Sequence, residues 1–91
     1  MVVVKSSGNV FTDLGFDAGE AANLQLRSHL MIEVEKAMAA KHLNQTTAAD
    51  VLGISQPRVS DLCRGKVDKF TIDMLVNLLA KLGHSVSVRV A

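Results

Sequence analysis

The stretch "NQTTAADVLGISQPRVSDLCRG", from Asn44 to Gly65, predicts two short helices joined by a tight turn. Asn44 and Ser55 each stand just before a helix-like segment, and their side-chain oxygens can accept hydrogen bonds from the free N–H groups of a first helical turn. Gly53 follows the first segment, and glycine readily adopts the left-handed conformation in which many helices end. The spacing therefore predicts a closely packed pair of helices over 45–52 and 56–64.

The side of segment 56–64 that faces away from the core follows from its apolar residues. If Val59 and Leu62 point inward, a rotation of about 100° per residue places the polar side chains on the opposite side. A pair of helices whose second member is presented outward is the helix-turn-helix arrangement, which enters the DNA major groove. The outward side carries Pro57, Ser60, Asp61 and Arg64, and Gln56 and Arg58 flank it in the first turn.

Donor and acceptor patterns assign a role to each polar side chain of this helix. Gln56 matches adenine N6 and N7, and either Arg58 or Arg64 matches guanine O6 and N7 or holds phosphates. Asp61 accepts from cytosine N4 or, in the interpretation we favour, supports Arg58 or Arg64 at helical spacing.

Further contacts to the DNA backbone are expected around the same helix. Ser60 and Thr46 are candidate phosphate donors. Pro57 offers only apolar contact, for example to a thymine methyl group. Lys66 and Lys69 follow the helix and are expected to contact the DNA backbone, although Lys69 can instead pair with the acidic residue before it.

Two further helices are predicted outside this stretch. Asp17, with Glu20 three residues later, has capping-box spacing and begins a helix over 18–41. Thr71 begins a helix over 72–82, whose apolar residues cover more than one face. That helix lies either at the centre of the core or against a partner. Val51, Leu52, Ile54, Val59 and Leu62 are expected to form the core shared by the two short helices.

The C-terminal sequence "HSVSVRVA" alternates valine with polar residues and predicts a strand over 85–91. A single strand is not stable alone in water. Its partner is either Val2–Val4 or the same strand of a second subunit. In the second case Val86, Val88 and Val90 form the interface of a homodimer.

Length and composition indicate one domain over 1–91, with the helix-turn-helix core at 45–65, an N-terminal segment at 1–16 and the strand at the end. The 91 residues are 48% hydrophobic and 21% charged, which is typical of globular proteins. No apolar run reaches the about 18–20 residues of a membrane span. A lone cysteine fits a reducing compartment, so we expect a cytoplasmic protein.

The segment "QTTAADVLGISQPRVSDLCRGK", Gln45 to Lys66, resembles the Cro/cI-type (XRE) helix-turn-helix family. It is most similar to the small HigA-like antitoxins, in which "LGISQPRVSDL" followed by "RGK" reads as a signature. "GNVFTDLGF" near the start and "FTIDMLVNLLAKLG" extend the resemblance over most of the chain from Gly8. The fold it implies is all-α, a lambda-repressor-like bundle of four to five helices with a short C-terminal strand.

The resemblance also implies partners. Gln45 would brace Gln56 and reach a phosphate, and the N-terminal part of 55–64, from Ser55 on, would read bases. The protein would repress transcription as a dimer on a palindromic operator. It would also neutralise a small basic toxin of the RelE/HigB type and autoregulate the operon that encodes both. Many antitoxins have a long disordered C-terminal tail; we expect none here, so the folded domain or the N-terminal segment would bind the toxin.

Other functions are weighed against this one. His29, His42 and His84 are far apart in the sequence and no metal-ligand spacing occurs, so we expect no metal, no cofactor and no enzymatic activity. Residues 1–35 hold two basic and five acidic side chains, net −3, and 36–91 hold eight and four, net +4. The acidic part suits a basic toxin, or is a solvated helix face. The alternatives are a stand-alone XRE-family regulator and a protein-interaction module that binds no DNA.

Overall fold

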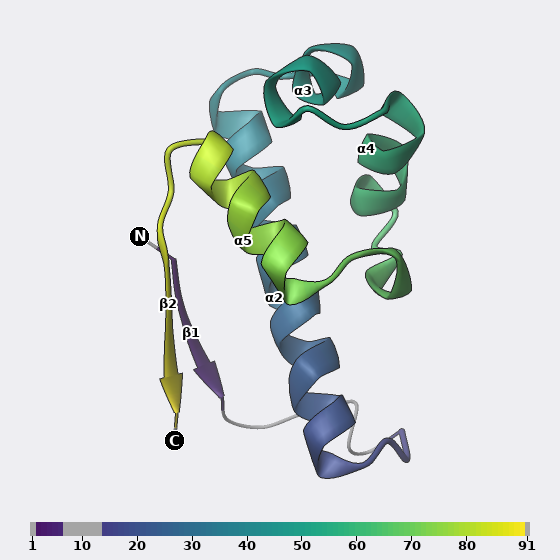
Figure 1. The fold of residues 1–91 in the computed structure, drawn as a ribbon, viewed down its shortest axis with the longest axis vertical. Helices are drawn as coiled ribbons and strands as arrows, with labels where there is room; N and C mark the ends of the chain where they lie inside the picture. Colours follow the sequence, from purple (N-terminus) through teal and green to yellow (C-terminus); the bar gives the residue numbers. More distant parts are fainter. Residues whose placement is uncertain (1, 7–13, 91) are drawn as a thin grey trace.

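A computed structural model describes residues 2–6 and 14–90 of the chain (Figure 1). Within these ranges the fold is all-α, with a small two-stranded sheet at one side. The predicted helices are confirmed to within one residue at each end, and the C-terminal strand likewise. The elements in chain order are β1 (Val2–Ser6), α2 (Ala18–Ala40), α3 (Gln45–Leu52), α4 (Gln56–Cys63), the 3₁₀ helix η1 (Val67–Lys69), α5 (Ile72–Lys81) and β2 (Val86–Val90).

Each α-helix begins at the cap that the sequence predicts. The Asp17 carboxylate accepts a hydrogen bond of 2.8 Å from the N–H of Glu20, and Thr71 Oγ1 accepts one of 3.2 Å from the N–H of Met74. At α3 the cap is reciprocal. Asn44 Oδ1 accepts from the N–H of Thr47 at 2.8 Å, while Thr47 Oγ1 accepts from the N–H of Asn44 at 2.9 Å. Local side-chain chemistry therefore fixes where the helices start.

The core lies between α2 and the shorter helices, and α5 runs beside α2 through its centre (Figure 1). Leu75 and Leu79 of α5 are fully buried, which places the 72–82 helix at the centre of the core. Val51 was expected in the core but is 44% exposed. The inward side of α3 is formed by Ala48, Ala49 and Leu52, and Val51 falls outside this line.

The predicted C-terminal strand finds its partner within the same chain. β1 and β2 pair in parallel, from Val2 opposite Val86 to Ser6 opposite Val90. β1 also packs against α2, and Figure 1 shows β2 on the outer side of β1. In the described ranges no third strand joins this sheet, so its order is β1-β2. Val88 in the middle of β2 is 47% exposed.

Candidate DNA-binding surface

The turn between α3 and α4 is held by a left-handed glycine and a lysine. Gly53 has a φ of 69°, and its N–H bonds to the carbonyl oxygen of Ala49 at 2.9 Å. Lys81 Nζ, at the end of α5, donates to the carbonyl oxygen of Leu52 at 2.8 Å. A cation at that point is favourable because the last carbonyl groups of a helix carry partial negative charge. α5 therefore fixes the end of α3 and the start of the turn.

α4 lies with the orientation that its apolar residues predict. Val59 and Leu62 are both 0% exposed and anchor it on the core. Gln56, Pro57 and Arg64 are exposed, while Ser60 and Asp61 are half-buried beside the anchors. At the start of α3, Gln45 and Thr46 are exposed as well. The candidate base-reading and phosphate-binding side chains thus lie on the outer side of two neighbouring helices, and their contact with DNA stays a prediction.

Ser55 is engaged at the N-terminus of α4. Its Oγ accepts a hydrogen bond of 3.4 Å from the N–H of Arg58, and Pro57 stands in the first turn, where a missing N–H matters least. Because Pro57 has no N–H and the N–H of Arg58 is bonded to Ser55, the N–H of Gln56 is the one left within residues 56–58 to bind an anion. Ser55 therefore acts first as a helix cap, and any DNA contact comes in addition.

Arg58 occupies a different position from the other candidates. Its guanidinium carbon lies 4.8 Å from the centre of the Phe70 ring, and its Nη2 lies 3.8 Å from Met74 Sδ. The side chain is half-buried against the start of α5 rather than extended from the surface. This separates Arg58 from the exposed Arg64.

Asp61 does not support an arginine, which corrects our favoured interpretation. Its Oδ1 lies 3.4 Å from Lys66 Nζ. Gly65, with a φ of 71°, reverses the chain after α4, and the N–H of Lys66 bonds to the carbonyl oxygen of Asp61 at 3.0 Å. The turn brings Lys66 closer to Asp61 than helical spacing brings either arginine. Lys69 is exposed, and no ion pair joins it to Asp68 in the part of the chain that the structure describes.

Arg27, for which the sequence suggested no role, connects α2 to the segment after α4. Its Nη1 donates to the carbonyl oxygens of Val67 at 3.0 Å and Phe70 at 3.3 Å. A single arginine on an amphipathic helix gives no sequence signal for such a contact, because both acceptors are backbone atoms about 40 residues away. Only the fold reveals it.

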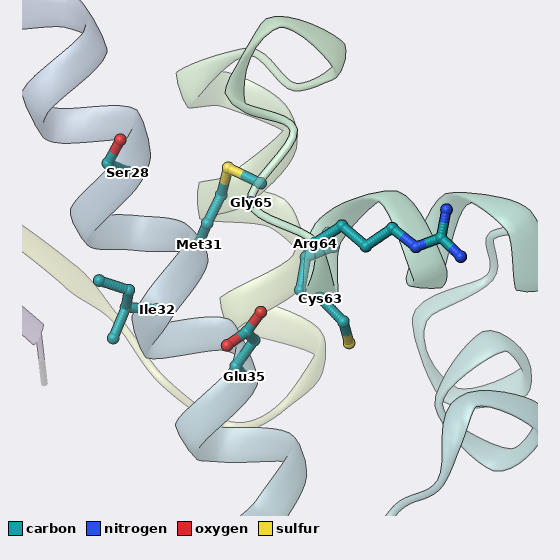
Figure 2. A pocket seen from close by; sticks show the side chains of 8 residues that line it. Ser28, Met31, Ile32, Glu35, Cys63, Arg64 and Gly65 are labelled. Carbon is teal, nitrogen blue, oxygen red and sulfur yellow. The ribbon is translucent and has the colours of Figure 1, made fainter.

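A groove of about 360 Å³ lies between α2 and the C-terminal end of α4 (Figure 2). Its apolar lining includes Ile32, which is 52% exposed. Glu35, Cys63 and Arg64 also line it, and Figure 2 shows the Arg64 side chain extending away from Glu35. Partial burial, and secondarily the charge of Glu35, raise the pKa of the Cys63 thiol. The thiol is therefore protonated at neutral pH and is a poor nucleophile.

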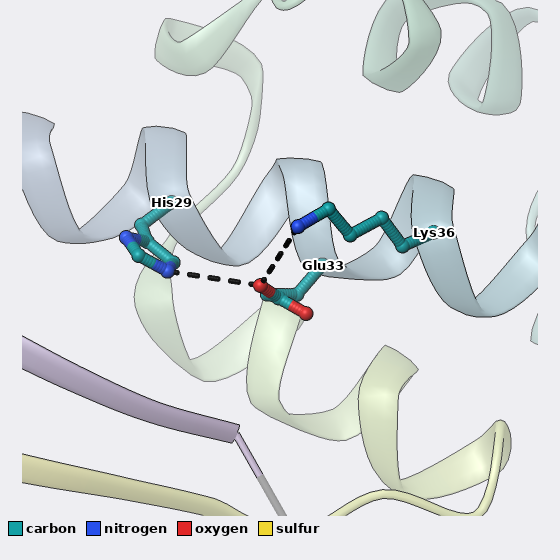
Figure 3. A network of polar contacts seen from close by, with 3 residues as sticks. All are labelled: His29, Glu33 and Lys36. Carbon is teal, nitrogen blue, oxygen red and sulfur yellow. Dashed lines mark ion pairs between the residues drawn. The ribbon is translucent and has the colours of Figure 1, made fainter.

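The other face of α2 carries a small ionic network (Figure 3). Glu33 Oε1 lies 3.7 Å from His29 Nε2 and 3.7 Å from Lys36 Nζ. Exposed pairs of this kind contribute little stability. Across residues 2–6 and 14–90 no cluster of three or more His, Cys, Asp or Glu side chains is arranged to hold a metal ion. Over the same residues no helix has the length and apolar character needed to cross a bilayer.

Comparison with known families agrees with this geometry. A family described as a helix-turn-helix domain matches residues 10–91, which is nearly the whole chain. A comparison with curated proteins gave no match. The match includes α3, α4 and the turn between them, together with the long helix and the C-terminal strand that support them. The chain belongs to the helix-turn-helix domain family.

Proposed function

We propose that the protein is a sequence-specific DNA-binding transcriptional repressor whose helix α4 enters the major groove. The observation that carries the proposal is the orientation of α4, with Val59 and Leu62 buried and Gln56 and Arg64 exposed. Gln56 pairs with adenine and Arg64 with guanine, since their donor and acceptor groups match those base edges. The protein acts by binding alone, without catalysis, metal or cofactor, in the cytoplasm.

Contacts to phosphates position α4 on the duplex. The N-termini of α3 and α4 suit this role because the N–H groups that the caps at Asn44 and Ser55 leave unpaired can attract anions. Lys66 is held by Asp61, which fixes its ammonium group beside the C-terminal end of α4. The proposed backbone contacts are Gln45, Thr46, Ser55, Ser60, Lys66 and Lys69, with Pro57 offering apolar contact to a thymine methyl group.

The proposal includes a homodimer on a palindromic operator. Two-fold symmetry in the protein matches two-fold symmetry in the site, so each α4 reads one half-site. One edge of β2 is paired with β1, and β2 lies on the outer side of β1. This position supports pairing of the other edge of β2 with a second copy of the protein. Val86 and Val88 would lie at that interface. Val90 belongs to the same prediction, and its side chain lies outside the described residues.

A second part of the proposal is that the protein is the antitoxin of a toxin–antitoxin pair, as its resemblance to HigA-like proteins implies. The groove beside α2 favours this role, because the exposed Ile32 lies next to the carboxylate of Glu35. An apolar surface with an uncompensated negative charge suits a basic protein partner. Glu33, in contrast, is already paired on the other face of the helix. The alternative is a stand-alone regulator without a toxin.

DNA binding is tested by fluorescence anisotropy with duplex from upstream of the protein's own gene and with a scrambled duplex. Gln56→Ala and Arg64→Ala should each weaken binding to the specific duplex by about 1–3 kcal/mol and leave binding to the scrambled one nearly unchanged. Lys36→Ala, on α2, is the matched control and should behave as wild type. Unchanged discrimination between the duplexes in both α4 variants would refute the assignment of α4.

The antitoxin role is tested by capture of the tagged protein from its own cells at native expression. A small basic protein that co-purifies in stoichiometric amount is the expected result. Ile32→Asp should release it without loss of DNA binding, because Ile32 lies on α2 and is not one of the proposed DNA contacts. Recovery of the protein with DNA alone would favour the stand-alone regulator.

The dimer is tested by sedimentation of the chain without residues 85–91. A monomer that has lost cooperative binding to two half-sites is expected. A truncated chain that is still dimeric would place the interface elsewhere.

A further inference from the structure

Helix α4 has few anchors for a helix that must read bases. Among its residues only Val59 and Leu62 are buried, and both lie on the same side. Two anchors in one line fix the depth of a short helix better than its rotation about its own axis. A recognition site must be held within about 0.5 Å and 10–20° of its productive geometry. A third contact, away from the line of the two anchors, is therefore required.

Arg58 provides this contact. It precedes Val59 by one residue and Leu62 by four, so its side chain leaves the helix about 100° around the axis from the first anchor and about 40° from the second, to one side of both. The guanidinium carbon lies 4.8 Å from the centre of the Phe70 ring, and Phe70 is only 1% exposed. A planar guanidinium over the face of a desolvated aromatic ring is a favourable and directional contact. The additional contact of Arg58 Nη2 with Met74 extends it onto α5.

Arg27 holds Phe70 from the side of α2. Its Nη1 donates to the carbonyl oxygens of Val67 and Phe70, at 3.0 Å and 3.3 Å, which lie at the two ends of the η1 turn. Phe70 directly precedes Thr71, the cap of α5. The ring is therefore fixed by its own burial, by the start of α5 and by a charged donor on α2.

We propose that Arg58 and Arg27 are positioning residues for DNA recognition, which act through Phe70 to fix the rotation of α4. The proposal rests on the proposed function, since it assumes that α4 reads DNA. The Arg58 guanidinium is engaged within the domain, and base reading falls to Gln56 and Arg64. Arg27 touches no DNA, yet its loss weakens recognition, because the ring under Arg58 is then less firmly held.

The test is selection of binding sites from a random duplex library with the wild type, Arg58→Ala, Arg27→Met and Arg64→Ala. The first two variants should lower the affinity for the wild-type site by a similar factor, on the order of tenfold. They should weaken base preference across the whole half-site. The slope of log affinity against log salt should stay unchanged, because no phosphate contact is removed. Arg64→Ala should instead lose preference at one base pair.

Arg58→Lys distinguishes positioning from direct contact. Lysine keeps the charge and a cation–π attraction but loses the planar stack, so positioning predicts that Arg58→Lys binds clearly more weakly than the wild type, whereas a phosphate contact predicts near-wild-type binding. Thermal unfolding shows whether each variant is folded at the assay temperature. If Arg27→Met is not folded, the two Arg58 variants decide alone.

Three results would overturn the inference. The first is loss of preference at a single base pair in Arg58→Ala, and the second is a salt slope reduced by about one in that variant. The third concerns the ring-current shift that Phe70 exerts on the Arg58 δ protons in NMR spectra, if that shift disappears when the selected duplex is added. Any of these would leave the proposed function intact. If the wild type selects no sequence, the proposed function fails and this inference fails with it.

Discussion

Replacement of Gly53 by alanine should destabilise the domain more than the same change at Gly65. Both glycines are left-handed, with φ of 69° and 71°, so alanine adds about 1–2 kcal/mol of backbone strain at either position. A Cβ at Gly65 would have no neighbour within 4 Å, whereas one at Gly53 would lie 3.1 Å from Lys81 Nζ. That contact requires the ammonium group that caps α3 at the carbonyl of Leu52 to shift by a few tenths of an ångström, which weakens the cap. The whole cap contributes about 0.3–1 kcal/mol.

The assay is urea denaturation followed by circular dichroism, with Lys81→Met as a second background. Gly65→Ala should lower the free energy of unfolding by about 1–2 kcal/mol, and Gly53→Ala should lower it by up to about 1 kcal/mol more than that. In the Lys81→Met background the two alanine variants should become equal, because the cap is already absent. An identical loss for both in the wild-type background, or a difference that persists without Lys81, would refute this account of the turn.

Three further predictions concern the cap of α3, the anchor of α4 and the thiol. Asn44→Ala should lower the free energy of unfolding by about 1 kcal/mol, because it removes the reciprocal cap with Thr47. Thr46→Ala, at an exposed position, is its control. Equal effects of the two substitutions would contradict the role of the cap. Leu62→Ala should lower stability by about 2–5 kcal/mol, since Leu62 is 0% exposed, and a loss below about 1 kcal/mol in urea denaturation would mean that α4 is not anchored there. The Cys63 thiol has a raised pKa in the folded state, so the folded chain retains its proton where the unfolded chain has lost it. Stability should therefore fall as the pH rises through the pKa of the unfolded thiol, and Cys63→Ser should remove this fall. Alkylation of Cys63 near neutral pH should accelerate in Glu35→Gln, and an unchanged rate would rule out the influence of Glu35.

Local chemistry made much of the fold predictable. The caps at Asp17, Asn44, Ser55 and Thr71 are side-chain contacts over three residues, so the sequence contains all the information they need. The ends of helices at left-handed glycines are predictable for the same reason. Val51 was misplaced because a helix of only eight residues gives too few turns to define its inward side from apolar spacing alone.

Contacts between distant segments could not be predicted in the same way. Asp61 was expected to support an arginine on its own helix, but the turn at Gly65 brings Lys66 to it instead. The stack of Arg58 on Phe70 depends on how α5 packs beside α4, which no local pattern specifies. The strand partner was open for a similar reason, because alternating valines identify a strand but not the strand that lies next to it.

The most direct test of the central claim is to map amide chemical-shift changes on the ¹⁵N-labelled protein as duplex from upstream of its gene is added. If α4 enters the major groove, the largest changes should lie between Gln45 and Lys66, concentrated at the N-termini of α3 and α4. The exposed face of α2 around Glu33 should remain unchanged. Changes centred away from α4, or none at low salt, would contradict the claim that this helix reads DNA.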